Sequence, residues 1–454
     1  MDVTGAVAQK GDVQLTLVTH DTVLRIPKAR QPLNGEFRVP GDKSISHRAV
    51  MLGAIAEGMT RIRGCLLSTD CMATIDAMRR LGVEIEVSAH EVLVHGRGLR
   101  GLREQGRPVE CGGSGTTMRL LSGLLAAQPF HSVLAGNAQL SKRPMDRVVA
   151  PLRTMGATIL AREGGKYPPL SISGGSLRGI TYQPPVASAQ VKSALLLAGL
   201  FADGTTTIEE LLPTRDHTER MLRAMDAEVK TIDNSVTIRP ASALSALDID
   251  VPADISSAAF LLVAASIVPG SRLILLGVGM NPGRTGIVTA LCRMGVKVVT
   301  HNKRVQNGEP VADLEVSYAP LTGITVSPQD VPGMIDELPI LAVAATQAEG
   351  VTEVRGAAEL RVKETDRIAT TVAELRKLGA NIESMADGFR VEGPTPLRGA
   401  VVSSHGDHRL AMALAIAGLA AEGETLIEGA DCTRDSFPGF EAILHRLSSG
   451  GDAL

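Results

Sequence analysis

The stretch Met78-Arg-Arg-Leu-Gly-Val-Glu-Ile85 has the pattern of a helix end followed by the start of a strand, and it recurs along the chain. Its glycine suits the position after a helix, where a positive φ is needed. The copies begin at residues 78, 152, 222, 291, 375 and 444, the last of them degenerate. A spacing of about 70 residues between copies predicts six structural repeats.

A second pattern, a short strand followed by a charged loop, recurs in phase with the first. Thr60-Arg-Ile-Arg-Gly64 and Thr425-Leu-Ile-Glu-Gly429 are two of its copies. Each repeat is therefore expected to hold helices and strands in roughly equal share. Six such units are too many for one core, so the sequence predicts an α/β (α+β) protein of two similar domains with three repeats each.

Two segments of similar sequence are expected to be crossings between these domains. Phe37-Arg-Val-Pro-Gly-Asp42 resembles the region Asp248-Ile-Asp-Val-Pro-Ala-Asp254 near the midpoint of the chain. The predicted division is an N-terminal extension at 1–30, a first domain at 41–250, and a second domain made of 31–40 plus 251–454. Charged loops from both halves would then face a cleft that can close on a ligand.

Composition limits the functions that this chain can serve. Its 454 residues carry a net charge of −3, with no Trp and three Tyr, so neither a global positive field nor stacking platforms favour nucleic acid. The five cysteines include no CxxC pair, which argues against a disulfide framework or zinc cluster and favours a reducing cytoplasm. No signal peptide is recognised, and the longest apolar run, 258–268, is about half of what spans a bilayer.

The segment Gly41-Asp-Lys-Ser-Ile-Ser-His-Arg48 lies where a strand-like stretch ends and an Ala-rich helix follows. Free backbone N–H groups and the helix dipole make such a place favourable for anions. Lys43 adds a mobile charge, and Arg48 adds a planar fork suited to carboxylate or phosphate. A solvated turn with a serine N-cap would be the plainer interpretation of this segment alone.

Similar charged or polar loops recur along the chain. Although each alone could be an ordinary solvated turn, their repetition favours a shared anion-binding site. The cationic or Gly-rich ones are 112–119, Lys142-Arg143 and Arg215-Asp216-His217, and 187–193 offers hydroxyl and amide donors. The acidic ones are Asp336-Glu337 and Glu364, which lies between Lys363 and Arg367. The alternative to a functional site is that these residues only cap helices and form local ion pairs. The His405-x-x-His408 pair lacks a third ligand pattern, so no metal is expected. The loops predict group transfer between anionic small molecules without a cofactor.

Nine motifs, in order from about residue 30 to the end, resemble the 5-enolpyruvylshikimate-3-phosphate synthase family, and their wording resembles its second class. They are GDKSISHR (41–48), SKRPM (141–145), ASAQVKSALLLAG (187–199), TRDHTE (214–219), NPGRTG (281–286), MIDELPILAVAA (334–345), LRVKETDR (360–367), DHRLAMA (407–413) and SFP (436–438).

The resemblance implies two domains, each of three βαβαββ-type units around a pseudo-threefold axis (an inside-out barrel), joined by two crossings. It implies transfer of the enolpyruvyl group of phosphoenolpyruvate to the 5-hydroxyl of shikimate 3-phosphate, with release of phosphate. That reaction serves chorismate and aromatic amino-acid biosynthesis, needs no metal or cofactor, and is the target of glyphosate. The expected protein is a cytoplasmic monomer without nucleic-acid or membrane partners.

The resemblance also implies roles for individual residues. Catalysis would use Lys43, Asp336 and Glu364. Shikimate 3-phosphate would be held by Lys43, Ser44, Arg48, Ser188, Ala189, Gln190, Arg215, Asp336 and Lys363. Phosphoenolpyruvate would be held by Lys43, Gly115, Arg143, Gln190, Arg367 and Arg409.

The chain departs from the family pattern at four of its positions. Gly113 replaces an Asn, Ala189 replaces a Ser, and Asp435 stands where many first-class members have Lys. Gly115 leaves room that an Ala would fill, so tolerance of glyphosate is not predicted from the second-class resemblance alone.

Two rival functions remain open. An enolpyruvyl transferase acting on UDP-N-acetylglucosamine would call for a Lys-Asn turn and a reactive Cys, whereas this chain has Lys43-Ser44, and Cys65 and Cys111 lie in other contexts. A non-catalytic repeat scaffold would present its basic loops to a protein or nucleic acid, and for that function the charge of the loops alone would suffice.

Overall fold

The repeat predicted from the sequence is visible in the first half of the chain as a buried helix, a strand, a second helix and a hairpin. We describe residues 23–449 of a computed structural model. In the first unit, α1 (Lys43–Ala54) leads to β3 (Met59–Arg63), α2 (Thr69–Arg80), β4 (Glu84–Val87) and β5 (Glu91–His95). β3 pairs antiparallel with β5, and β5 with β4, while β14 (Ile249–Asp250) adds a parallel strand at the other edge of β3.

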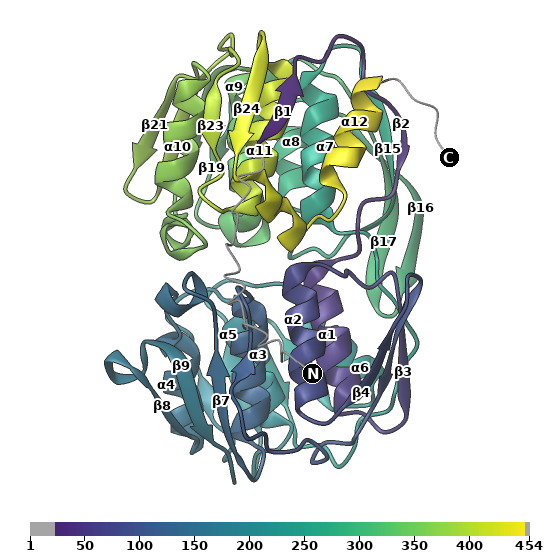
Figure 1. Cartoon of the computed structure of the whole chain (residues 1–454), viewed down its shortest axis with the longest axis vertical. Coiled ribbons are helices and arrows are strands. Elements are labelled where there is room, and N and C mark those ends of the chain that lie inside the picture. The colour runs from purple at the N-terminus through teal and green to yellow at the C-terminus, as the bar shows by residue number, and fades with distance from the viewer. Residues whose placement is uncertain (1–22, 450–454) are drawn as a thin grey trace, which may run out of the picture.

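Two further units complete the lower body in Figure 1, which we define by its core from Ile45 to Val251. Their sheets have the orders β6-β7-β9-β8 and β10-β11-β13-β12. Their helices are α3 (Gly115–Ala126), α4 (Asp146–Met155), α5 (Ala189–Gly199) and α6 (His217–Ala224). Their strands are β6 (Val109–Glu110), β7 (His131–Ala135), β8 (Thr158–Arg162), β9 (Tyr167–Ser173), β10 (Thr181–Tyr182), β11 (Thr206–Glu209), β12 (Val229–Ile232) and β13 (Ser235–Ile238).

The upper body repeats this plan around a second core, which runs from Leu24 to Val39 and from Ala253 to Leu447. Its helices are α7 (Ile255–Ile267), α8 (Gly286–Arg293), α9 (Leu338–Thr346), α10 (Arg367–Lys377), α11 (His408–Ala420) and α12 (Phe440–Ser449). Its strands are β1 (Leu24–Pro27), β2 (Asn34–Phe37), β15 (Arg272–Gly279), β16 (Val298–Gln306), β17 (Glu309–Ser317), β18 (Leu321–Thr322), β19 (Thr325–Val326), β20 (Ala348–Val354), β21 (Ile382–Met385), β22 (Gly388–Gly393), β23 (Val401–Ser403) and β24 (Glu424–Glu428).

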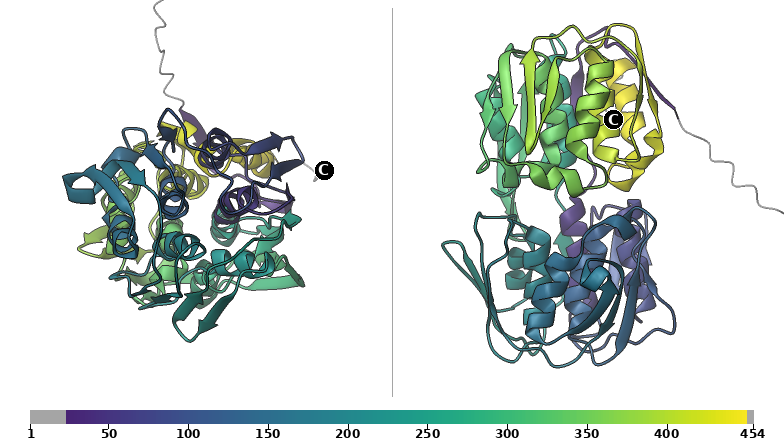
Figure 2. Two further views of the ribbon diagram at one scale, coloured as in Figure 1. Left: turned by 90° about the horizontal axis from the view of Figure 1, so that it is seen from below. Right: turned by 90° about the vertical axis from the view of Figure 1, so that its left-hand side faces the viewer.

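The six sheets formed by residues 23–449 remain separate, and none closes into a barrel. Strands lie toward the outside of each body and helices toward its centre (Figure 2). This arrangement follows from composition, because helices such as α7 are apolar on every side and are buried at every position. Small residues let the helices approach closely: a Cβ on Gly123 of α3 would lie 2.1 Å from the carbonyl oxygen of Ala194 on α5.

The sixth repeat is incomplete, and the N-terminal segment completes it. After α11 and β24 the chain continues into α12, and β1 pairs antiparallel with β24, so that Leu24 faces Ile427. Leu24 and Ile26 join the upper core. The prediction of an extension over 1–30 is therefore wrong for residues 24–27, which belong to a sheet. Residues 1–22 lie outside the described residues.

The two predicted crossings lie side by side between the bodies. Asp42 N donates to Pro252 O at 2.8 Å, and Asp254 N donates to Pro40 O at 2.9 Å. The hairpin of β16 and β17 adds a further link, because the side chain of Asn307 at its turn hydrogen-bonds Asp248 O and Asp250 N. Figure 1 shows this hairpin reaching toward the lower body. No helix within residues 23–449 is both long and apolar enough to cross a bilayer.

Candidate active site

The N-termini of helices from both bodies converge between them. On the lower body Asp42, Ser114 and Ser188 cap α1, α3 and α5, and their side chains accept from the backbone N–H of Ile45, Thr117 and Val191. On the upper body Asp407 caps α11 and accepts from Arg409 N at 2.9 Å. The N-cap of α1 is thus Asp42 rather than a serine, and Ser44 lies inside the helix. Helix N-termini gathered in this way favour bound anions.

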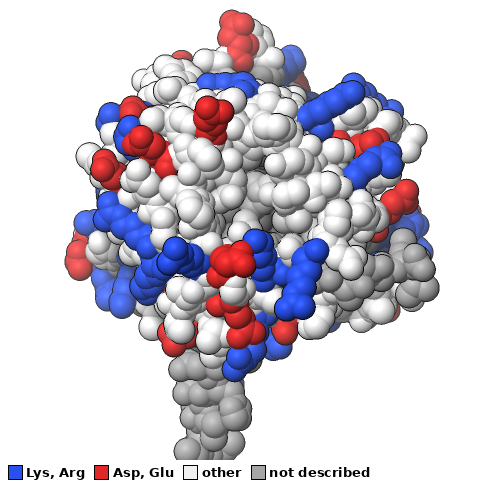
Figure 3. Space-filling model, turned by 90° about the horizontal axis from the view of Figure 1, so that it is seen from above, with Lys and Arg blue, Asp and Glu red and all other residues white. Residues whose placement is uncertain are grey.

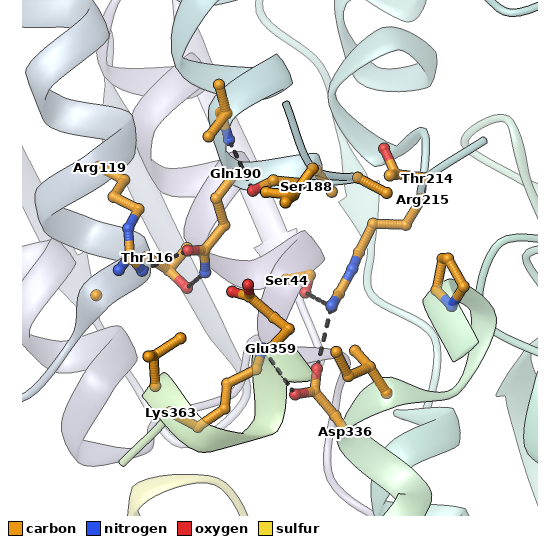
Figure 4. A pocket seen from close by; sticks show the side chains of 18 of the residues that line it. Ser44, Thr116, Arg119, Ser188, Gln190, Thr214, Arg215, Asp336, Glu359 and Lys363 are labelled. Carbon is orange, nitrogen blue, oxygen red and sulfur yellow. Dashed lines mark hydrogen bonds and ion pairs between the residues drawn. The ribbon is translucent and has the colours of Figure 1, made fainter. Parts of the chain in front are cut away.

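A cavity of about 550 Å³ lies at this junction. Every residue that the sequence assigned to substrates or catalysis lines it: Lys43, Ser44, Arg48, Gly115, Arg143, Ser188, Ala189, Gln190, Arg215, Asp336, Lys363, Glu364, Arg367 and Arg409. Figure 4 shows side chains from both bodies around it, with Arg215 and Lys363 on two sides of the Asp336 carboxylate.

Lys43 begins α1, and its ammonium group forms an ion pair with Asp70 at the start of α2. Burial opposes the charge of Lys43, but the Asp70 carboxylate outweighs it, so the pKa of Lys43 is raised. Lys43 is therefore a permanent cation on the floor of the cleft. Asp70 was noted in the sequence only as a charged loop residue.

Two arginines stand on the lower wall. Arg48 is 3% exposed and donates to Thr218 Oγ1 and Ser193 Oγ, both at 2.7 Å. Burial, with the nearby Arg215, lowers the pKa of Arg48 to about 10, which still leaves it charged at neutral pH. Arg215 donates to Ser44 Oγ at 3.2 Å and to Asp336 Oδ2 at 3.1 Å.

Asp336 lies opposite, in a short 3-10 turn (η4, Ile335–Glu337) before α9. Besides Arg215, it has Arg367 at 3.3 Å and Lys363 at 3.5 Å from its Oδ1. Burial alone would raise the pKa of Asp336, but Lys363, Arg215 and the other cations hold it well below the usual range. Asp336 is therefore a carboxylate, able to accept a proton when a ligand engages its cations.

Glu364 lies in the loop between η5 (Ala358–Val362) and α10, and the Arg367 guanidinium bridges its carboxylate to that of Asp336. The oxygens of Glu364 bind Arg143 of the lower body at 3.0 Å and Arg367 at 2.5 Å. Burial favours the neutral acid, but Arg143 and Arg367 hold the pKa of Glu364 well below its usual range. Arg367 is itself fixed by Asp407 at 2.7 Å, so this wall is preorganised.

Arg409 differs from the other cationic residues of the cleft. It is 7% exposed and lines the cavity, yet within residues 23–449 its guanidinium makes no hydrogen bond or ion pair. It lies next in sequence to His408, whose pKa burial and Lys43 lower far below the usual range, and its positive charge helps to lower the pKa of Asp336. A buried guanidinium without a carboxylate partner is suited to an anionic ligand.

Gln190 and Gly115 shape the side of the cleft near Arg143. Gln190 accepts from Arg119 Nη1 at 2.6 Å and donates to Thr116 Oγ1 at 2.9 Å. A Cβ on Gly115 would lie 2.8 Å from Arg119 Nη1 and 3.2 Å from Arg143 Cζ. The room that the sequence suggested at Gly115 is thus taken up by guanidinium groups.

Sequence reasoning missed three residues that the structure brings to the cleft. Arg119 orients Gln190, and Arg147 of the lower body binds both oxygens of Glu359 on the upper body at 2.8 and 2.6 Å. Arg147 follows Arg143 by four positions, and Glu359 opens the charged run before α10, so the sequence did place charged residues at both positions. The His405-x-x-His408 pair does not converge, because His405 binds Glu374 at 2.8 Å while His408 lines the cavity.

Known proteins match this chain over nearly its whole length. A family model described as EPSP synthase (3-phosphoshikimate 1-carboxyvinyltransferase) matches residues 27–444. A protein of Brevibacillus brevis with the latter name is 52% identical over 426 residues, which are 94% of this chain and 100% of the relative. A protein of Bacillus subtilis with the same name is 51% identical to this chain over 419 residues, which are 92% of this chain and 98% of the relative.

A solved structure, EPSP synthase from Acinetobacter baumannii, superposes with a TM-score of 0.84 at 46% identity and covers 94% of this chain and 98% of its own. The family inferred from nine motifs is confirmed, as is the predicted fold. The chain belongs to the EPSP synthase family.

Proposed function

We propose that this protein transfers the enolpyruvyl group of phosphoenolpyruvate to the 5-hydroxyl of shikimate 3-phosphate and releases phosphate. One observation carries the proposal: cations from both bodies surround Asp336 and Glu364 in a single cleft. The two substrates together bring two phosphates and two carboxylates, which match such a cleft in charge. The carboxylates of the protein itself, Asp336 and Glu364, can accept and donate protons during the reaction.

Shikimate 3-phosphate would occupy the side formed mainly by the lower body. Its phosphate would lie against Arg215 and the α5 N-terminus, where Ser188, Ala189 and Gln190 stand. Ser44, Arg48 and Lys363 would hold the rest of the molecule. The 5-hydroxyl would face Asp336.

Phosphoenolpyruvate would occupy the opposite side, between Gly115, Arg143 and Gln190 below and Arg367 and Arg409 above. Lys43 lies where it would touch both substrates. Binding draws donors from both bodies, so each substrate favours the closed cleft. Because Arg367 and Arg143 also hold Glu364, an anion that binds them releases this carboxylate from its ion pairs.

The release of Glu364 from its ion pairs by a bound substrate explains how a strongly paired carboxylate can take part in proton transfer. Glu364 is ionised in its ion pairs with Arg143 and Arg367. Once substrate anions bind these arginines, the pKa of Glu364 rises, and it can pass a proton to the methylene carbon of phosphoenolpyruvate with Lys43. Asp336 accepts the proton of the attacking hydroxyl. Return of a methyl proton to Glu364 then expels phosphate, and the proton held by Asp336 leaves with the phosphate, so both carboxylates are restored at the end of the cycle.

We further propose domain boundaries at 40/41 and 250/251, a second-class assignment, a monomer, and a cytoplasmic location. The two separate cores support the boundaries. Five free cysteines support a reducing compartment.

The rival enolpyruvyl transferase is disfavoured by its missing nucleophile. Burial raises the pKa of Cys65 to about 11 and that of Cys111 further, so both are thiols at neutral pH. A basic scaffold is disfavoured because cations of the cleft are paired with Asp336 and Glu364. The face seen in Figure 3 also mixes both charge signs around an uncharged centre.

The test is phosphate release by the purified protein with phosphoenolpyruvate and either shikimate 3-phosphate or UDP-N-acetylglucosamine. Release with shikimate 3-phosphate alone supports the proposal. Release with the sugar nucleotide, or none from folded protein with either acceptor, overturns it.

A further inference from the structure

A buried ammonium group lies behind the lower wall of the cleft. Lys192, in the first turn of α5, is 1% exposed. Its Nζ lies 2.9 Å from Glu210 Oε2 and 2.7 Å from Glu219 Oε1. The side chains of these carboxylates are only 9% and 1% exposed. One cation is therefore shared by two carboxylates that would otherwise face each other away from water.

This cluster fixes the turn that precedes Arg215. Glu210 Oε1 accepts from the backbone N–H of Thr214 at 3.1 Å and from its hydroxyl at 2.5 Å. Lys192 Nζ donates to the carbonyl oxygen of Thr214 at 3.3 Å. Both backbone groups of Thr214 are thus bound from behind, and the next side chain, Arg215, points into the cleft toward Ser44 and Asp336 (Figure 4).

A second branch of the cluster reaches Arg48. The two hydroxyls that hold the Arg48 guanidinium belong to Ser193 and Thr218, the neighbours in sequence of Lys192 and Glu219. The Glu219 carboxylate also counteracts the effect of burial on the pKa of Arg48. Both arginines on this wall therefore depend on the same buried charges.

Lys192 itself does not line the cleft, whereas Thr214, Arg215 and Arg48 do. We infer that Lys192 is a positioning residue for the shikimate 3-phosphate side of the cleft, acting through the Thr214–Arg215 turn and through Arg48. This inference rests on the proposed function. The arginines on the phosphoenolpyruvate side come from other loops, so Lys192 should affect one substrate and leave the other unchanged.

The experiment compares Lys192→Met with wild type in calorimetric binding of shikimate 3-phosphate and in steady-state kinetics with each substrate varied. Loss of the charge should raise the dissociation constant and KM for shikimate 3-phosphate at least roughly tenfold, while KM for phosphoenolpyruvate stays within about twofold. The variant Lys192→Met/Glu219→Gln removes one of the stranded charges. It should recover part of the lost thermal stability, since only Glu210 remains without its cation, and it should not recover shikimate 3-phosphate affinity, because Thr214 O still lacks its donor.

A merely structural role predicts a different pattern. Affinity that returns together with the melting temperature in the double variant would overturn the inference, as would equal rises in both KM values. Wild-type binding in a folded Lys192→Met protein would overturn it too. Where the single variant does not fold, the double variant carries the same comparison. Wild-type protein that neither binds shikimate 3-phosphate nor releases phosphate would instead overturn the proposed function, and the inference with it.

Discussion

At the scale of single residues, Asp336 is the clearest candidate for the proton acceptor. Three cations within 3.5 Å keep it ionised. We expect Asp336→Asn to lower kcat by about 10²–10⁴-fold, the usual contribution of a general base. Binding of shikimate 3-phosphate should remain, because Arg48, Arg215 and Lys363 are kept. Rapid-quench turnover and calorimetry measure the two quantities separately, and equal losses in both would contradict the assignment.

Gly115 tests how tightly the phosphoenolpyruvate side is packed. An alanine Cβ would come within 3.2 Å of both Arg119 and Arg143, so their guanidinium groups must shift. We expect Gly115→Ala to raise KM for phosphoenolpyruvate roughly tenfold, equivalent to about 1.4 kcal/mol. Inhibition by glyphosate should weaken at the same time. Inhibition curves for both proteins are the measurement, and coincident curves would show that the space at Gly115 does not matter.

Asp435, one of the departures from the family pattern, gives a pH prediction. Burial, with the nearby Asp70, raises its pKa from 3.8 to about 6. A raised acid pKa favours the protonated form in the folded state, so the group is most favourable below pH 3.8 and loses stability as pH rises through 6. Asp435→Asn, permanently neutral, should therefore stabilise the protein at pH 8 by ~1 kcal/mol after allowance for partial exposure.

Urea unfolding of the Asp435→Asn variant at pH 8 and pH 5 checks the sign, with a smaller gain expected at pH 5. Asp431→Asn, on the same turn but exposed, serves as the control. A gain that is the same at both pH values would show that the effect does not come from ionisation.

The residues that could be predicted from sequence are those whose loops carry dense local charge. Lys43, Arg143 and Glu364 all stand in such runs. Arg147 and Glu359 could not be paired in advance, because they are 212 positions apart and meet only when the bodies come together. Lys192 lies in the segment 187–193 that the sequence analysis singled out, but its carboxylate partners Glu210 and Glu219 stand 18 and 27 positions away, so its burial between them could not be predicted.

At the scale of elements, the contact between α3 and α5 sets the distance between Gln190 and Thr116. Gly123 allows this contact, since a Cβ there would lie 2.1 Å from Ala194 O, a rigid backbone atom. We expect Gly123→Ala to destabilise the protein by about 1–3 kcal/mol, the usual cost of overpacking. Gly175→Ala is the control, because its Cβ would meet nothing within 4 Å. Urea unfolding measures both, and similar values for the two would contradict close packing.

The elements themselves were foreseeable wherever the repeat keeps its pattern. A helix end followed by the start of a strand marked five of the six units, with a glycine between them in four units and Asp226 in the fifth. The sixth was not foreseeable, because its missing hairpin strand is replaced by β1, whose Arg25 pairs with Glu424 399 positions away. Local sequence carries no record of a partner at that distance.

At the scale of the whole molecule, closure of the cleft depends on ion pairs between the bodies. Arg143–Glu364 and Arg215–Asp336 involve groups that substrates are proposed to engage, whereas Arg147–Glu359 lies at the rim, with side chains 27% and 31% exposed. One nitrogen of Arg147, Nη1, contacts both oxygens of Glu359, and neither residue is among those proposed to bind substrate, so this pair can link the two bodies without substrates. A pair of this exposure is worth about 0–1 kcal/mol, so its loss should alter the balance between open and closed forms without unfolding either body.

We expect Arg147→Gln to shift the open-to-closed ratio by up to about fivefold, the effect of 1 kcal/mol. Small-angle X-ray scattering without substrates should then give a larger radius of gyration, which returns to the wild-type value when both substrates are added. The exchange Arg147→Glu/Glu359→Arg should restore the compact form, since it restores the pair. Arg390→Gln, which breaks an exposed pair within β22, should change nothing. If the Arg147→Gln and wild-type profiles coincide without substrates, the remaining ion pairs close the cleft unaided and Arg147–Glu359 is only a surface contact.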